Sequence, residues 1–150
     1  GFFVYAPDKM GESLQSRMIM ADFINFKSVK RPPKPNTCLA APDNYTLASD
    51  ADFAPPVFEQ SAEDLFKKIS DIISAERSWG RLEKDAAQRK LKFVATTGLM
   101  RFKDDVDIEI IPLEDGRSTL AVYSRSRVGY SDLGANRKRV NNLIGRVTTN

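Results

Sequence analysis

The chain has 150 residues, of which 41% are hydrophobic and 29% are charged, and its formal net charge is +3. This length suits one domain with a single hydrophobic core. The sequence contains no histidine, and its only cysteine is Cys38. These absences exclude Ser-His-Asp and Cys-His catalysis, zinc sites built from Cys and His, and an internal disulfide. We expect no metal site and no cofactor.

The first residues of the chain include an apolar cluster, residues 2–5 (FFVY), which is followed at once by proline and charge. Such a transition is typical of the end of a signal peptide or membrane anchor, where aromatic residues lie at the interface. An ordinary first strand is the alternative explanation. No segment of the printed sequence approaches the ~20 consecutive apolar residues that span a bilayer.

Residues 1–58 have the pattern of an extended arm. Prolines stand at positions 7, 32, 33, 35, 42, 55 and 56. Each proline removes a backbone donor and pushes its predecessor out of the helical region. Leu14 and Met18 approximate a helical stripe, which favours one short helix near residues 13–23. We therefore divide the chain into an arm (1–58) that follows an expected membrane anchor, and a folded domain (59–150).

The folded domain begins with a helical pattern at residues 61–76. Ser61 is a good N-cap, and Glu63 and Asp64 place negative charge in the first turn. Apolar residues then recur at helical spacing: Ala62, Leu65, Phe66, Ile69, Ile72 and Ile73. The segment is predicted to be an amphipathic helix with one buried face.

Further along the chain the apolar period changes to two. Residues 90–95 and 105–111 alternate apolar and polar side chains, which predicts half-buried strands. The Asp115-Gly116 pair predicts a hairpin turn into a further strand, and Asp132 is expected to cap a closing helix. The sequence thus predicts an α+β fold, a curved antiparallel sheet with two main helices packed on one face, preceded by the proline-rich arm.

Three segments carry a resemblance to a known family: KPNTCLAAPDN (34–44), LMRFKDDVDIEI (99–110) and STLAVYSRSRVGYSDLGANRKRV (118–140). They resemble motifs of the domain-of-unknown-function family 1499, particularly its proteobacterial membrane-anchored branch. That branch commonly has an Asp-Tyr pair where this chain has Thr37 and Cys38. The resemblance implies an N-terminal transmembrane segment ahead of an extracytoplasmic domain, on the periplasmic side of the inner membrane. It brings no activity, ligand or catalytic residue.

The segment 124–140 concentrates basic residues near one acid, Asp132, and has two explanations. In the first it is a structural seam, in which Arg125 or Arg127 pairs with an acid across the hairpin and Asp132 caps the closing helix. The hairpin acids are Asp105 and Asp107, and Asp132 would also hold the side chain of Asn136 or Arg137. In the second explanation five side chains form a cradle for an anion or a partner: Arg125, Arg127, Tyr130, Arg137 and Arg139. We favour the seam, because charged runs usually form paired or solvated faces.

The remaining patterns favour an interaction role. Asp105, Asp107 and Glu109 share one strand face about 7 Å apart, too spread for a calcium site. Although the pI is about 9.0, no aromatic RNA-binding strand or DNA-recognition helix is visible, so we expect no nucleic acid partner. The leading hypothesis is a non-catalytic, membrane-tethered extracytoplasmic interaction domain, an accessory subunit of a membrane assembly, whose partner is another membrane or envelope protein or anionic lipid headgroups.

Two alternatives stay open. The chain is a binder of a small anionic ligand or lipid headgroup, which would need a pocket with convergent arginines. Otherwise it is a histidine-free enzyme, whose acid or base would come from Asp, Glu, Lys, Tyr or Cys38.

Overall fold

A computed structural model describes residues 22–149 of the chain. The apolar cluster at residues 2–5 and residues 13–21 of the expected short helix lie outside the described residues. Within residues 22–149, no helix has the length and apolar character needed to cross a bilayer.

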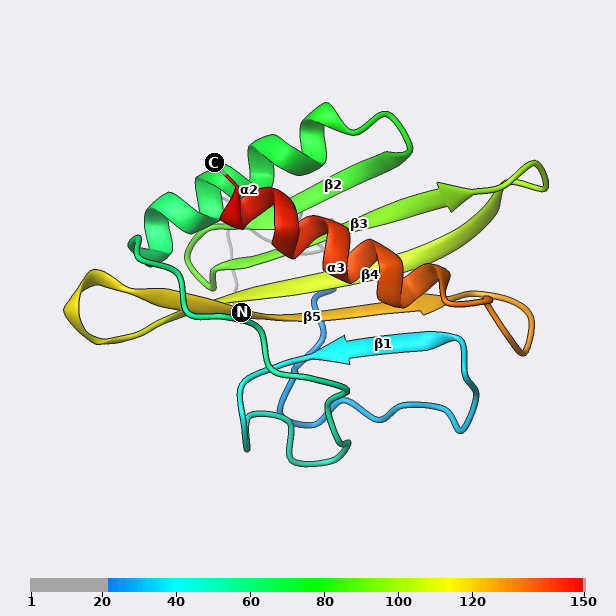
Figure 1. Ribbon diagram of the computed structural model, residues 1–150, viewed down its shortest axis with the longest axis horizontal. Coiled ribbons are helices and arrows are strands. Elements are labelled where there is room, and N and C mark those ends of the chain that lie inside the picture. The colour runs from blue at the N-terminus through cyan, green and yellow to red at the C-terminus, as the bar shows by residue number, and fades with distance from the viewer. Residues whose placement is uncertain (1–21, 150) are drawn as a thin grey trace, which may run out of the picture.

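Five antiparallel strands form one sheet in the order β1-β5-β4-β3-β2 (Figure 1). The strands are β1 (Thr37–Ala40), β2 (Trp79–Asp85), β3 (Lys90–Thr97), β4 (Phe102–Pro112) and β5 (Ser118–Ser126). With the two helices described below, the sheet confirms the predicted α+β fold. The three strands expected from period-two patterns correspond to β3, β4 and β5.

The two edge strands, β1 and β2, were not expected from the pattern. β1 has only four residues and is covered on both faces, so it lacks the alternation of a half-buried strand. In β2 the pairing with β3 shifts register between Gly80 and Glu83, and Arg81 there has a positive φ of 56°. Such a bulge breaks the period of two, which explains why β2 has no visible strand pattern.

The expected turn between β4 and β5 is present and tight. Asp115 and Gly116 have φ angles of 59° and 70°, and Glu114–Gly116 forms a single short turn. Positive φ at both central positions is the geometry that a two-residue hairpin requires, and Asp-Gly supplies it at low cost.

Both helices, α2 (Ala62–Ala75) and α3 (Ala135–Thr148), pack on the same face of the sheet (Figure 1). The Ser61 hydroxyl accepts a hydrogen bond from the Asp64 N–H at 3.1 Å, which confirms the predicted N-cap. The main core lies between helices and sheet, and its largest fully buried side chains include Leu65, Ile69, Ile73, Phe93, Ile108, Leu120 and Leu143.

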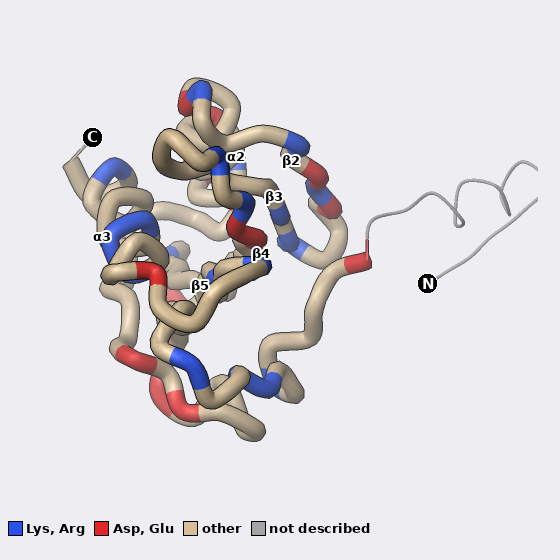
Figure 2. Tube along the Cα trace, turned by 90° about the vertical axis from the view of Figure 1, so that its right-hand side faces the viewer, with Lys and Arg blue, Asp and Glu red and all other residues tan. Residues whose placement is uncertain are grey.

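The opposite face of the sheet carries a second, smaller core. It is built by Phe26, Leu39, Ala41, Ala121 and Tyr123, so residues from the segment that begins at Asp22 lie against β5. The Tyr45 hydroxyl also donates to a Glu109 carboxylate oxygen on β4 at 2.8 Å. Figure 2 views these layers from one end of the sheet, with α3 on one side and this N-terminal segment on the other.

Candidate functional site

Part of the 124–140 segment, together with Asp104 of β4, forms a buried junction between the sheet and α3. We call its four residues the polar seam: Asp104, Ser124, Asn136 and Arg139. The Ser124 hydroxyl donates to the Asn136 side-chain oxygen at 2.6 Å. Arg139 Nη1 donates to Ser124 Oγ at 3.0 Å and to Asn136 Oδ1 at 2.9 Å. All four residues are buried, so their polar atoms form hydrogen bonds with one another and not with solvent.

A buried ion pair completes the polar seam. Arg139 Nη2 lies 2.9 Å from Asp104 Oδ2, and the two side chains are only 5% and 3% exposed. Burial raises the pKa of Asp104, while the charge of Arg139 and its hydrogen bond oppose that shift. Asp104 was not among the residues expected to pair. Its side chain lies on the helix side of β4, opposite to those of Asp105 and Asp107, and its partner comes from α3. The pair fixes how α3 sits on the sheet.

Asp132 acts at the start of α3, although from an unexpected position. The helix begins at Ala135, and Gly134 occupies the N-cap with a φ of 84°. Asp132 accepts hydrogen bonds from the Gly134 N–H at 2.8 Å, from the Asn136 N–H at 3.0 Å and from the Asn136 side-chain amide at 2.7 Å. Although burial acts to raise it, these bonds hold the pKa of Asp132 below its ordinary value.

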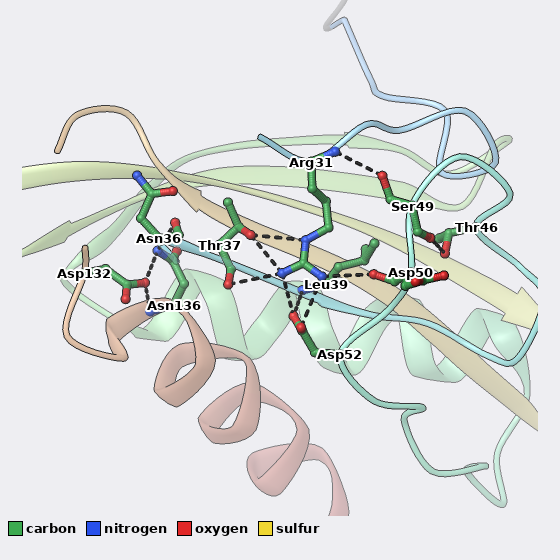
Figure 3. A network of polar contacts seen from close by, with 10 residues as sticks. All are labelled: Arg31, Asn36, Thr37, Leu39, Thr46, Ser49, Asp50, Asp52, Asp132 and Asn136. Atoms are coloured by element: carbon green, nitrogen blue, oxygen red, sulfur yellow. Dashed lines mark hydrogen bonds and ion pairs between the residues drawn. The ribbon is translucent and has the colours of Figure 1, made fainter. Parts of the chain in front are cut away.

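Asn136 connects this helix start to β1 (Figure 3). Its side-chain amide also donates to the Asn36 carbonyl and to Ser126 Oγ, each at 2.9 Å. The Asn36 amide in turn donates to the Gly129 carbonyl at 2.8 Å. The turn between β5 and α3 is therefore tied to the residue that precedes β1.

The five residues considered for an anion cradle do not meet at one place. Arg139 is buried in the polar seam, on the helix side of the sheet. The Arg137 guanidinium lies 5.4 Å from the centre of the Phe53 ring, and the Tyr130 side chain is exposed. Arg125 and Arg127 line a cavity together, but none of the other three lines it. Strand alternation separates the arginines of β5 from those of α3.

On the face away from the helices, Arg125 and Arg127 pair with acids of β4. Arg125 Nη1 lies 2.7 Å from Asp107 Oδ2. Arg127 donates twice to Asp105, at 3.0 and 2.9 Å. The hydrogen bond from Arg127 is the largest effect on Asp105 and holds its pKa below the ordinary value, against the opposing effect of burial. Both pairs join residues that are diagonal in the sheet. Arg125 stands directly opposite Asp105, but it pairs with Asp107, and Asp105 pairs with Arg127.

The Arg127–Asp105 pair should contribute little to stability, because its side chains are 46% and 35% exposed. We expect Arg127→Ala to lower the free energy of unfolding by about 0.5–1 kcal/mol at neutral pH. Because its pKa is lowered, Asp105 stabilises the fold above its ordinary pKa of about 4, and this contribution disappears as the pH falls through the lowered value. Urea denaturation at neutral and acidic pH measures both effects, with Arg117→Ala as the control. A deficit of about 2 kcal/mol or more, or one that persists at acidic pH, would contradict this expectation.

A polar groove crosses the sheet on this same face. Its first part is a cavity of about 250 Å³, which we call the basic pocket and which is lined by four cations: Arg77, Arg81, Arg101 and Lys103. Ser78, Gly80, Val94, Thr96 and Gly98 complete its lining. The second part, about 310 Å³, shares Arg81 and Val94 with the first and holds the two Arg–Asp pairs described above. The sequence pattern does not reveal this pocket, because its cations come from two segments that are far apart in the sequence, 77–81 and 101–103.

An apolar patch lies at the end of the sheet where β3 turns into β4 and β5 leads to α3. We call it the apolar tip, and its exposed side chains are Leu99, Met100, Phe102, Val128, Tyr130 and Leu133. Phe102, Val128 and Leu133 line one cavity of about 230 Å³, which joins the two loops. Leu99 is fully exposed, at 101%. This end is on the right in Figure 1 and faces the viewer in Figure 2. Its side chains come from two segments that are far apart in the sequence, 99–102 and 128–133, so no local pattern reveals the patch.

The Cys38 thiol is buried in the core. Cys38 is 1% exposed, and burial, followed by the charge of Asp52, raises its pKa to about 11. A buried thiol with so high a pKa is a poor nucleophile at neutral pH. In the part of the chain that the structure describes, no three His, Cys, Asp or Glu side chains are grouped to hold a metal ion.

Comparison with known proteins places the chain in a family. No curated protein matches this chain in a sequence search. The sequence model of one family, described as "Protein of unknown function (DUF1499)", matches residues 29–147. The match covers β1 through nearly all of α3, and with it the polar seam, the basic pocket and the apolar tip. The chain is therefore a member of the DUF1499 family.

Proposed function

We propose that this protein is a non-catalytic, membrane-tethered extracytoplasmic interaction domain whose apolar tip docks on the surface of an anionic lipid bilayer. The observation that carries the proposal is the apolar tip itself. Six of the nine large apolar side chains that are exposed in residues 22–149 gather there. Clustered exposed apolar side chains on a soluble fold are typical of interaction sites.

The shape of the apolar tip favours a bilayer over a flat protein interface. Leu99 and Met100 occupy the turn between Thr97 and Phe102, the last paired residues of the β3–β4 hairpin. Leu133, in the loop before α3, has a positive φ of 54° and is 90% exposed. Narrow turns that carry apolar side chains can enter the headgroup region without any change in the sheet, and the gain grows with the apolar area that they bury.

Charges beside the apolar tip complement an anionic surface. Arg101 and Lys103, on either side of Phe102, are exposed. The acids nearest in sequence are engaged, since Asp104 pairs with Arg139 and Asp132 accepts bonds from Gly134 and Asn136. Each Lys or Arg held near an anionic membrane contributes about 1 kcal/mol to binding. The tethering and the extracytoplasmic location follow the resemblance noted from the sequence motifs.

Vesicle co-sedimentation with the full chain tests this proposal. We expect binding to vesicles of phosphatidylglycerol and phosphatidylcholine, and weaker binding to phosphatidylcholine alone. Leu99→Ser/Met100→Ser should weaken binding about tenfold or more, because the apolar burial is lost. Both side chains are exposed, so the melting temperature should not change.

The matched control is Leu47→Ser/Val57→Ser, which removes two exposed apolar side chains elsewhere, and it should bind as the wild type does. Equal binding by the tip variant would refute the proposal. Retention by native membranes without binding to protein-free vesicles would replace the bilayer with a protein partner.

A further inference from the structure

We infer that the basic pocket is a binding site for a phosphate monoester group, carried by a lipid headgroup or by a free phosphorylated ligand. The pocket is distinct from the apolar tip, and its cations are not those that the sequence motif suggested. Arg77 comes from the turn before β2, Arg81 from β2, Arg101 from the β3–β4 turn, and Lys103 from β4.

The backbone brings these cations together at two left-handed positions. Arg81 lies in the bulge of β2, and Arg101 closes the β3–β4 turn, each with a φ of 56°. The Arg101 N–H donates to the Gly98 carbonyl at 3.1 Å, which closes that turn. Thr96 and Lys103 stand opposite each other in the sheet, so β3 and β4 form the floor between the two arginines.

Within residues 22–149, no carboxylate lines the basic pocket. The Glu76 carboxylate accepts a hydrogen bond from Ser78 of the lining at 3.0 Å, but it pairs with Arg146, at 3.1 Å, and not with a cation of the pocket. Among the described residues, the side chains of Arg77, Arg81 and Arg101 form no ion pair or hydrogen bond, and Lys103 Nζ donates only to the Thr96 hydroxyl, at 3.1 Å. In the adjoining part of the groove, by contrast, Arg125 and Arg127 each have an aspartate partner. Four cations gathered without an acid repel one another, and a bound anion would relieve that repulsion.

The chemistry of the lining suits a phosphate monoester. Guanidinium groups donate two parallel hydrogen bonds to the oxygens of phosphate. The Thr96 hydroxyl accepts from Lys103 and can donate its own proton to the ligand. A monoester carries close to two negative charges at neutral pH, whereas a diester carries one, so four cations favour the monoester. The volume of about 250 Å³ is below the ~300–1,000 Å³ of sites that enclose a whole small molecule, which fits a single headgroup.

The basic pocket adjoins the apolar tip through one turn. Gly98 and Arg101 line the pocket, and they flank Leu99 and Met100 of the tip. A lipid whose phosphate occupied the pocket would therefore place its acyl chains beside the tip. The lipid source rests on the proposed function, whereas the phosphate site does not.

The experiment has two arms, both with the full chain. The first is calorimetric titration with glycerol 3-phosphate, a soluble monoester. The second compares vesicles of phosphatidic acid with vesicles of phosphatidylglycerol at matched surface charge, both in phosphatidylcholine. We expect the wild type to bind in at least one arm, with about a fivefold preference for the monoester lipid if the source is a lipid. The variant Arg81→Gln/Arg101→Gln should lose the titration signal and the preference.

The variants separate this inference from the proposed function. Leu99→Ser/Met100→Ser should bind all vesicles about tenfold or more weakly and keep the glycerol 3-phosphate signal. The pocket variant should keep the vesicle binding that the tip provides. Lys67→Gln/Arg117→Gln removes two charges outside the pocket and should behave as the wild type does. The inference is overturned if the wild type shows neither signal, if the pocket variant keeps them, or if the charge control loses them equally.

Discussion

Replacing Arg139 with leucine should lower the free energy of unfolding by about 3–5 kcal/mol at neutral pH. The substitution leaves the carboxylate of Asp104, which is 3% exposed, without its cation. It also removes the guanidinium that donates to Ser124 and to Asn136. Urea denaturation followed by circular dichroism measures the loss. The control is Arg137→Leu, which removes an exposed arginine two positions away and should cost less than about 1 kcal/mol.

The loss should depend on pH in a known direction. Burial already raises the pKa of Asp104 against the effect of Arg139, so removal of Arg139 should raise it further. A carboxyl group with a raised pKa in the folded state destabilises the fold as the pH rises from its unfolded pKa of about 3.9 through the folded value. The variant should therefore be less impaired under mildly acidic conditions than under mildly basic ones.

A second substitution tests the cause of that loss. Asp104→Asn in the Arg139→Leu background removes the buried charge and should restore a large part of the stability. Two outcomes would show that the ion pair does not hold α3 on the sheet. In the first, Arg139→Leu loses less than about 1 kcal/mol of unfolding free energy. In the second, the double variant is no more stable than Arg139→Leu alone.

Replacing Arg31 with alanine should cost about 2–3 kcal/mol and should loosen the outer edge of β1. Arg31 donates to both carboxylate oxygens of Asp52, at 3.1 and 2.8 Å, and to Thr37 Oγ1 at 2.9 Å (Figure 3). The Arg31 and Asp52 side chains are 21% and 25% exposed, so the pair is partly shielded from water. Asp52 also accepts the Leu39 N–H at 2.9 Å and so covers the free edge of β1. An uncovered edge strand exposes unpaired backbone donors.

Hydrogen exchange identifies this local effect. In Arg31→Ala the amide of Leu39 should exchange about tenfold faster or more, since its acceptor is no longer held in place. Lys30→Ala, at an exposed neighbouring position, is the control and should exchange as the wild type does. Arg31→Lys should show an intermediate loss, because an ammonium group cannot make two parallel bonds to a carboxylate. Unchanged exchange at Leu39 in Arg31→Ala would contradict the role given to Arg31.

The sequence was sufficient for the elements whose signal is local. The Ser61 cap and the apolar stripe of α2, the alternation of β3 and β4, and the Asp115-Gly116 turn each depend on residues a few positions apart. Such signals follow from backbone geometry and from one buried face, so they can be recognised without a partner segment. β1 and β2 lack them, because β1 is buried on both faces and β2 contains a bulge.

The candidate sites depended on contacts between distant segments. The sequence placed Arg125 and Arg127 on one strand face, and the structure gives each an aspartate of β4. It could not show that Arg139 turns inward to Asp104 or that Asp52 covers β1, because those pairs depend on how α3 and the N-terminal segment meet the sheet.

By itself, then, the sequence determined the α+β class, the two helices and the hairpin, and it excluded histidine chemistry. Only the tertiary structure decided which of the arginines in residues 22–149 pair with an acid. The reason is physical: a charge is balanced by whatever lies within a few ångströms of it, and that distance is set by strand order, register and helix packing rather than by spacing along the chain. The basic pocket and the apolar tip exist only where the β2 bulge, the β3–β4 turn and the loop before α3 come together.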